Sequence, residues 1–261
     1  WNNLGLAWHS LGKYEKAIRF YEKALNSDLK TYGKEHPQVA IYWNNLGEAW
    51  RKLGKYDKAI KYLEKALKSD LKTYGKEHPN VATRWNNLGV TWDSLGKYEK
   101  AIKYYEKALE SDLKTYGKEH PDVATDWNNL GEAWRKLGKY DKAIEFYGKA
   151  LASDIKKDQK RVAIYWNNLG LAWYGLGKYD KAIEYLKKSI QINIKYYGKE
   201  HHDVANNLKN LGKVYIVLEK YDKAIEDLER ALNIFFATVG NEHPKTKEVR
   251  ENLEFARSKI K

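Results

Sequence analysis

Apolar residues recur along the chain at the spacing of amphipathic helices. The first stripe has the spacing i, i+3, i+7 and i+10 and consists of Trp1, Leu4, Trp8 and Leu11. After Gly12, a longer stripe begins at Tyr14 and continues to Tyr32. Gly33 suits a left-handed helix end, and Pro37 suits the first turn of the next helix. The pattern predicts a helical hairpin with a longer second helix.

This hairpin is repeated. The pentapeptide WNNLG begins at residues 1, 43, 85, 127 and 166, and a decayed copy, LKNLG, begins at residue 208. The first two units agree at 31 of 42 positions, which indicates recent duplication or consensus design. One hairpin cannot bury both of its faces, so the units have to stack. We predict an all-α, right-handed superhelical solenoid of six hairpins over residues 1–249, and a polar C-terminal capping helix over residues 246–261.

Two units depart from the pattern. The fourth is three residues shorter and has DIKKDQKRVA in place of the TYGKEHP segment. The first lacks the residues that open the first helix elsewhere, such as Val39, Ala40 and Tyr42, so we expect its apolar stripe to fray or to meet a partner chain. Because the chain begins with Trp1 and contains no Met, we also expect it to be part of a longer protein.

The repeat resembles the tetratricopeptide repeat, whose pattern is W-x2-L-G-x2-Y, then A-x3-F, then Pro. The matching residues in the first unit are Trp1, Leu4, Gly5, Trp8, Ala17 and Tyr21. The family's usual period is about 34 residues and its second helix ends at the Pro. Here the equivalent positions hold Leu29, Leu71, Leu113, Ile155, Ile194 and Phe236. Without the Pro, the second helix can continue, and the longer unit is similar to the repeats of kinesin light chains and related bacterial proteins.

Composition excludes several classes of function. The chain contains no Cys, which rules out disulfides and thiolate chemistry. No apolar run approaches the roughly 18 residues of a membrane span, so we expect a soluble, cytoplasmic protein. The recurring loop histidines stand about one helix spacing apart, too far to share a metal ion. The recurring serines lack a paired base. We therefore predict no enzymatic activity, no cofactor and no metal.

The charge of +13 comes from 48 Lys and Arg against 35 Asp and Glu. Lysines recur every seven residues along the second helix, beside a row of acids. Interleaved rows are typical of a solvated face, although a basic strip for acidic proteins, RNA or lipid head groups remains an alternative. The variable positions of the first helix are nearly neutral in sum, and a nucleic-acid groove would concentrate the positive charge there. We expect nucleic acid to be an unlikely partner.

The Asn pair of WNNLG lies off the packed stripe, because helical angles of about 100° and 200° separate the two residues from Trp1. An amide offers both a donor and an acceptor, which suits a peptide backbone. In tetratricopeptide proteins the first helix lines the concave groove, and Asn at this place clamps the backbone of a bound peptide. The resemblance therefore implies peptide-binding residues at Asn44, Asn45, Glu48, Arg51, Lys52, Asn86, Asn87, Val90, Asp93, Asn128, Asn129, Glu132, Arg135, Lys136, Asn167, Asn168 and Tyr174. Alternatively, one Asn of each pair bonds a neighbouring helix and holds the repeats together.

We therefore predict a protein–protein interaction scaffold that binds an extended peptide or a partner helix in its concave groove. The alternative is an architectural array without a dedicated ligand, which self-associates through the uncapped N-terminal end.

Overall fold

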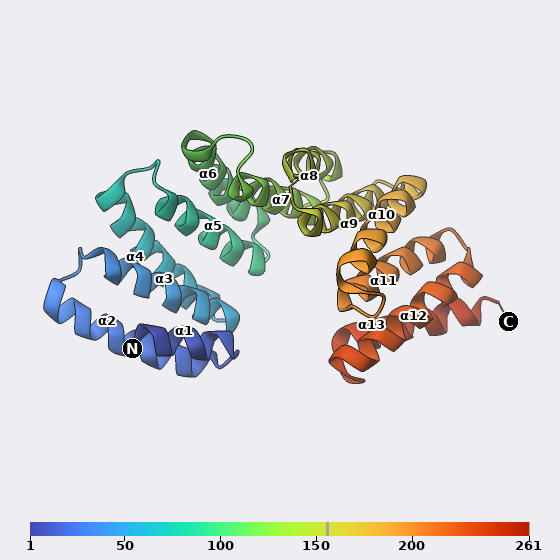
Figure 1. Cartoon of the computed structure of the whole chain (residues 1–261), viewed down its shortest axis with the longest axis horizontal. Helices are drawn as coiled ribbons and strands as arrows, with labels where there is room; N and C mark the ends of the chain where they lie inside the picture. Colours follow the sequence, from blue (N-terminus) through green and yellow to red (C-terminus); the bar gives the residue numbers. More distant parts are fainter. Residues whose placement is uncertain (155–156, 261) are drawn as a thin grey trace. The chain divides into compact units, whose positions relative to one another are not determined.

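The computed structural model describes residues 1–154 and 157–260, and these residues form thirteen α-helices (Figure 1). The first helices of the hairpins are α1 (Asn2–Ser10), α3 (Pro37–Lys52), α5 (Pro79–Ser94), α7 (Pro121–Lys136), α9 (Gln159–Gly175) and α11 (His202–Val217). The second helices are α2 (Tyr14–Tyr32), α4 (Tyr56–Tyr74), α6 (Tyr98–Tyr116), α8 (Tyr140–Asp154), α10 (Tyr179–Tyr197) and α12 (Tyr221–Val239). The last helix is α13 (Pro244–Ser258). The predicted all-α fold of stacked helical hairpins is confirmed.

Apart from α8, whose described part ends at Asp154, the second helices are longer than the first, as the missing proline predicts. Helix α2 runs through Leu29 and α4 runs through Leu71, and both end at a Gly with positive φ. Ile155, at the equivalent place in the fourth repeat, lies outside the described residues. Among the described helices, none combines the length and the apolar character needed to cross a membrane.

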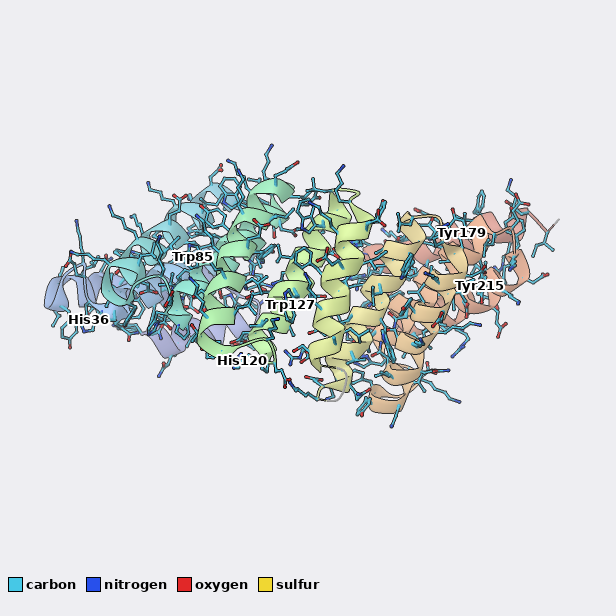
Figure 2. The ribbon with its side chains drawn as sticks, turned by 90° about the horizontal axis from the view of Figure 1, so that it is seen from above. His36, Trp85, His120, Trp127, Tyr179 and Tyr215 are labelled. Carbon is cyan, nitrogen blue, oxygen red and sulfur yellow. The ribbon has the colours of Figure 1, made fainter. Side chains whose placement is uncertain are left out.

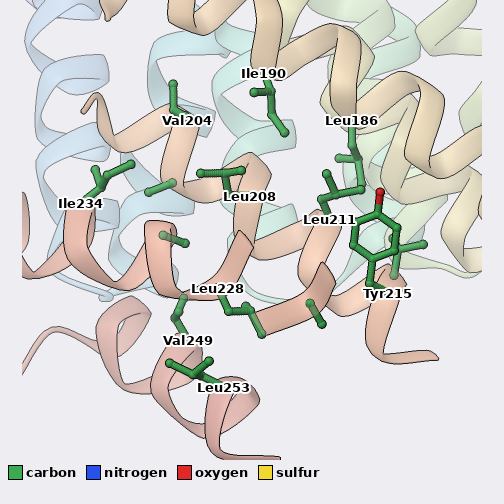
Figure 3. Packing of buried hydrophobic residues seen from close by; sticks show 14 of the residues in the cluster. Leu186, Ile190, Val204, Leu208, Leu211, Tyr215, Leu228, Ile234, Val249 and Leu253 are labelled. Atoms are coloured by element: carbon green, nitrogen blue, oxygen red, sulfur yellow. The ribbon is translucent and has the colours of Figure 1, made fainter. Parts of the chain in front are cut away.

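The chain divides into an N-terminal unit, residues 1–137, and a C-terminal unit, residues 138–261. In the N-terminal unit, fully buried Leu46, Leu63 and Leu88 lie between consecutive helices. In the C-terminal unit, α10 to α13 share one apolar cluster (Figure 3), which includes Leu186, Leu208, Leu228, Val249 and Leu253. Each unit therefore has its own buried core.

Small residues in the first helices let the second helices approach closely. A Cβ atom added to Gly47 would lie 2.6 Å from Cγ of Leu63, and one added to Gly89 would lie 2.5 Å from Cε1 of Tyr105. Gly170 has the same relation to Leu186. A large buried side chain thus fills the space that each Gly leaves, which explains why the repeat keeps Gly in the middle of a helix despite its low helix propensity.

The recurring loop histidines cap the following helices. The Nδ1 atom of His78 accepts the backbone N–H of Asn80 at 3.1 Å, and its ring stacks on Tyr74 with the centroids 4.1 Å apart. His36 and His120 make the same contacts, and both lie at the lower edge of the ribbon in Figure 2. Each His therefore satisfies one of the N–H groups that a helix start leaves without a partner.

The two ends of the chain differ in what covers them. Helix α13 packs on α12 and buries Val249 and Leu253. At the other end, Leu4 is 48% exposed, whereas the equivalent Leu46 is completely buried. Helix α2 packs against α3 and covers its apolar stripe. Within the described chain, no helix precedes α1 to cover its stripe in the same way.

Candidate functional site

The Asn pairs form hydrogen bonds between successive repeats. In each bond, the Nδ2 group of the second Asn of one repeat donates to Oδ1 of the first Asn of the repeat before it. The bonds join Asn45 to Asn2 at 3.2 Å, Asn87 to Asn44 at 2.8 Å, Asn129 to Asn86 at 2.9 Å and Asn210 to Asn167 at 3.0 Å. We call this series the asparagine ladder. It is the arrangement expected of residues that hold the repeats in register.

The ladder leaves part of each amide unused. Asn87 donates to Asn44 and also to Oε1 of Glu48, at 2.9 Å, so both of its N–H groups are engaged. Within the described residues, no group donates to the side-chain Oδ1 atoms of Asn45, Asn87 and Asn129. Each of these three repeats therefore keeps one open acceptor, whereas Oδ1 of Asn168 in the C-terminal unit accepts from Asn167 at 3.3 Å.

The predicted side chains of the groove lie on the same helices as the ladder. Glu48 and Lys52 follow Asn45 at i+3 and i+7, which places them on one face of α3. Val90 and Asp93 follow Asn86 and Asn87 on α5, and Glu132, Arg135 and Lys136 follow Asn128 and Asn129 on α7. Helix α5 contacts both α3 and α7. The N-terminal unit therefore brings the predicted residues of three repeats onto adjoining helices.

Several charges on this face are already paired. Lys136 of α7 contacts Asp93 of α5 at 2.6 Å, and Arg135 contacts Glu132 at 2.6 Å. Arg51 and Lys52 have no carboxylate partner within the described residues. Pairing thus removes much of the charge from α5 and α7 and leaves two cations on α3.

His9 of α1 lies in the electrostatic neighbourhood of these two cations. Burial lowers the pKa of the His9 imidazole, and Lys52 and Arg51 lower it further, while Glu48 opposes the shift. The His9 ring also meets Tyr14 edge-on, with the centroids 5.1 Å apart. His9 therefore favours its neutral form and adds an apolar ring to a cationic surface.

In the C-terminal unit, the predicted residues Asn167, Asn168 and Tyr174 lie on α9. The Tyr174 ring is 5.8 Å from the Tyr179 ring. On α11, Lys209 contacts Glu248 of α13 at 2.8 Å, and Lys213 pairs with the same carboxylate. The single carboxylate of Glu248 offsets one of the two lysine charges, so this face of the C-terminal unit is less charged than the sequence of α11 indicates.

A second series of polar contacts, which the sequence reasoning missed, joins each second helix to the first helix of the next repeat. The contacts are Tyr42 to Asp28 at 2.8 Å, Arg84 to Asp70 at 2.9 Å, and Tyr165 to Asp154 at 2.9 Å. At the equivalent place on α6 and α7, Asp112 and Asp126 share a hydrogen bond. The available signal was the residue before WNNLG, which is Tyr42, Arg84, Asp126 and Tyr165 in successive repeats while WNNLG itself stays constant.

The lysine rows are more than a solvated face. The Nζ atom of Lys58 lies 4.2 Å from the centroid of Trp50, and Lys16, Lys100 and Lys181 lie over equivalent indoles at 4.1 to 4.3 Å. Further along the second helix, Lys72 pairs with Glu35, and Lys114 with Glu77. Some lysines therefore bind an aromatic ring of their own hairpin, and others bind the preceding loop.

One group in the described chain has the composition of a metal site. His201, His202 and Asp203 offer ligand atoms within 4.8 Å of one another. However, Nδ1 of His201 accepts the backbone N–H of Asp203 at 3.2 Å, and the group stands at a helix N-terminus, which disfavours cations. The cluster acts as a helix cap like those of the other loops.

Comparison with known proteins places these features in a family. The model described as tetratricopeptide repeat matches residues 1–72, 39–114, 94–156 and 161–237. No curated protein matches the chain.

Solved structures share the fold. The kinesin light chain TPR-like repeats of Podospora anserina superpose with a TM-score of 0.67 at 22% identity, over 78% of this chain and 98% of that one. BtubC (BKLC) of P. vanneervenii gives 0.73 at 25% identity, over 88% and 94% of the two chains. A STAND protein with a tetratricopeptide repeat sensor from Pyrococcus horikoshii gives 0.78 at 19% identity, over 98% of this chain and 38% of that one.

The predicted resemblance is thus confirmed by an independent match over most of the sequence. Repeats of this kind are generally non-enzymatic scaffolds for protein–protein interaction. The chain belongs to the tetratricopeptide repeat family.

Proposed function

We propose that the face carrying the asparagine ladder binds an extended polypeptide. The observation that supports this function is the row of open side-chain carbonyl oxygens on Asn45, Asn87 and Asn129, one in each of three successive repeats. A peptide backbone presents N–H donors that such acceptors can bind. The ladder bonds hold the amides in place before binding, which lowers the entropic cost of recognition.

The side chains around the ladder indicate what the peptide carries. Arg51 and Lys52 are cations without an acidic partner in the described chain, so they favour a carboxylate or carbonyl group beside α3. The paired charges of Asp93 and Lys136 offer less to a ligand, because each already satisfies the other. Within the N-terminal unit, the proposed ligand therefore carries a carboxylate or another polar group beside α3.

Two substitutions that break the same hydrogen bond, one on each side of it, test this function. Asn87→Ala breaks the bond to Asn44 and removes the open acceptor, whereas Asn44→Ala breaks the same bond and leaves the carbonyl group of Asn87 in place. Peptides would be selected from a random phage-displayed library on the wild-type chain, and their affinities measured by isothermal titration calorimetry. We expect Asn87→Ala to weaken binding about tenfold, the equivalent of one good hydrogen bond, and Asn44→Ala to weaken it much less.

Equal losses in the two variants would show that the ladder is purely structural and would remove the peptide clamp. Failure of the library to yield any peptide competing for this face would argue against the function as a whole.

A second candidate function is self-association, which the exposed end of α1 favours. Trp1, Leu4 and Leu11 are all exposed there, and exposed apolar clusters of this kind mark association sites. Static light scattering over a dilution series, with Leu4→Glu as the variant, tests it. We expect the wild type to gain mass on concentration and the variant to stay monomeric; a wild type that remains monomeric throughout would exclude this function.

A further inference from the structure

A pair of equivalent pockets lies on the second-helix side of the N-terminal unit, away from the asparagine ladder. The Trp85 pocket has a volume of about 390 Å³, and Trp85, labelled in Figure 2, lines it together with Leu67, Tyr104, Lys76, Lys107 and Lys114. The Trp43 pocket has a volume of about 330 Å³, and its lining includes Trp43, Lys34, Glu35, Lys65, Lys68 and Lys72. Corresponding residues differ by one repeat of 42 positions.

An ion pair between a second helix and the preceding loop recurs in both pockets. The loop after one second helix is fixed to the next second helix: Ser111 donates to the carbonyl of Lys76 at 3.0 Å, and Thr115 to that of Glu77 at 2.9 Å. Lys114 adds an ion pair with Glu77 at 3.2 Å. In the preceding repeat, Lys72 pairs with Glu35. The two hydrogen bonds and the ion pair fix the loop beside the Trp85 pocket, and the ion pair is the corresponding contact beside the Trp43 pocket.

The charge of the pockets is positive after pairing. Lys72 pairs with Glu35, and Lys114 pairs with both Glu77 and Glu110. The charges of the lining residues sum to +3 in the Trp43 pocket and to +1 in the Trp85 pocket. Lys65 and Lys68 in the Trp43 pocket, and Lys76 and Lys107 in the Trp85 pocket, have no carboxylate partner within residues 1–154 and 157–260. Each pocket therefore combines the apolar surface of a Trp with two lysines that have no carboxylate partner, whereas most charges on α5 and α7 of the ladder face are paired.

We propose that the Trp43 and Trp85 pockets form a second binding surface, which takes an acidic polypeptide segment with aliphatic side chains at repeated intervals. Aliphatic side chains fill the space beside Trp85 and Leu67, and carboxylates meet the free lysines at the rims. Two pockets one repeat apart favour a linear partner, because it engages both at once and gains avidity. A second copy of this chain fits poorly, since its own charge of +13 is repelled.

In the Trp85 pocket, the position of the indole makes a polypeptide a better occupant than single-stranded RNA. Trp85 is only 7% exposed, so its ring cannot serve as the open stacking platform that bases require. Leu67 and Leu71 beside it offer contacts to apolar side chains and none to a phosphate backbone. The binding surface therefore matches alternating acidic and aliphatic residues.

The test uses fluorescence anisotropy with labelled synthetic peptides. The probe repeats Glu-Glu-Leu and is long enough to cross both pockets, and the matched probe repeats Glu-Glu-Ser. The variant Lys65→Glu/Lys107→Glu reverses one free cation in each pocket. The control, Lys55→Glu/Lys97→Glu, makes the same change of charge in the same two repeats, at exposed residues at the opposite ends of α4 and α6. Circular dichroism verifies that both variants fold.

We expect the wild type to bind the leucine probe at least about tenfold more tightly than the serine probe, because transfer of leucine side chains from water into the pockets is favourable. Lys65→Glu/Lys107→Glu should lose about tenfold in affinity, and the control should retain it. Equal losses in the two variants would show diffuse electrostatic attraction and overturn the proposal. So would equal binding of the two probes, or tighter binding of a labelled oligouridine than of the leucine probe.

Discussion

Asp112 of α6 and Asp126 of α7 form a hydrogen-bonded pair of carboxyl groups that are 7% and 3% exposed. Burial raises the pKa of Asp112 to about 6, and burial together with the Asp112 charge raises the pKa of Asp126 to about 9. Nearby Asp122 raises both pKa values, and His120 lowers that of Asp112. In the two preceding repeats and in the next one, the aspartate equivalent to Asp112 contacts a tyrosine or an arginine instead. Among the contacts of this series that the structure describes, the contact of Asp112 with Asp126 is the one between two carboxyl groups.

This pair makes the stability of the N-terminal unit depend on pH. The folded pKa values lie above the ordinary value of 3.8, so the folded pair holds protons that the unfolded chain releases. The contribution of this pair to the free energy of unfolding is therefore highest below about pH 4, and it falls as pH rises through the folded pKa values near 6 and 9.

Urea titrations followed by circular dichroism between about pH 4 and pH 9 measure how steeply the free energy of unfolding changes with pH. Asp126→Asn should flatten the slope, whereas Glu106→Gln, an exposed acid on α6, should leave it unchanged. Matching slopes in wild type and Asp126→Asn would contradict this assignment.

The buried ion pair of Arg84 and Asp70 predicts a large effect of truncation. Both side chains are less than a tenth exposed, and removing one partner leaves the other charged and unsatisfied. We expect Arg84→Ala to cost about 3–5 kcal/mol in the free energy of unfolding. Arg84→Tyr should cost much less, because Tyr42 and Tyr165 bond the equivalent aspartates. Urea midpoints measure both effects, and similar losses for Ala and Tyr would contradict the prediction.

The close approach at Gly89 predicts a position that tolerates no side chain. A Cβ atom there would lie 2.5 Å from the Tyr105 ring, so we expect Gly89→Ala to cost about 1–3 kcal/mol. Gly148, in the middle of α8, has open space around it, and Gly148→Ala should gain about 0.5–1 kcal/mol from helix propensity. Thermal unfolding followed by circular dichroism measures the change in stability of each variant and shows whether it is a loss or a gain. A gain at both positions would mean that Tyr105 can move aside.

The cap at His78 predicts that its removal lowers the free energy of unfolding modestly and that another capping residue recovers part of the loss. His78→Ala removes the acceptor for the N–H of Asn80 and the stacked ring beside Tyr74, so we expect a cost of about 1–2 kcal/mol. His78→Asn should recover part of this loss, since Asn is also a good N-cap. Denaturant midpoints measure the effects, and hydrogen exchange of Asn80 would locate them. No recovery with Asn would indicate that the ring stacking dominates.

The sequence alone determined the fold. The stripes from Trp1 to Leu11 and from Tyr14 to Tyr32 follow the period of a helix, and that period depends only on local backbone geometry. The return of WNNLG at fixed intervals predicted the stacking, because a hairpin with two apolar faces cannot bury both by itself. The missing proline at Leu29 and Leu71 likewise predicted the longer second helices.

Only the tertiary structure decided what the polar residues do. Asn44 and Asn87 are 43 positions apart, and nothing local in the sequence reports that their amides meet. The same holds for the shared proton of Asp112 and Asp126, and for the pairing of Asp93 with Lys136. A polar side chain is defined by its partner across an interface, and the partner's position follows from how rigid helices pack rather than from the period of either one.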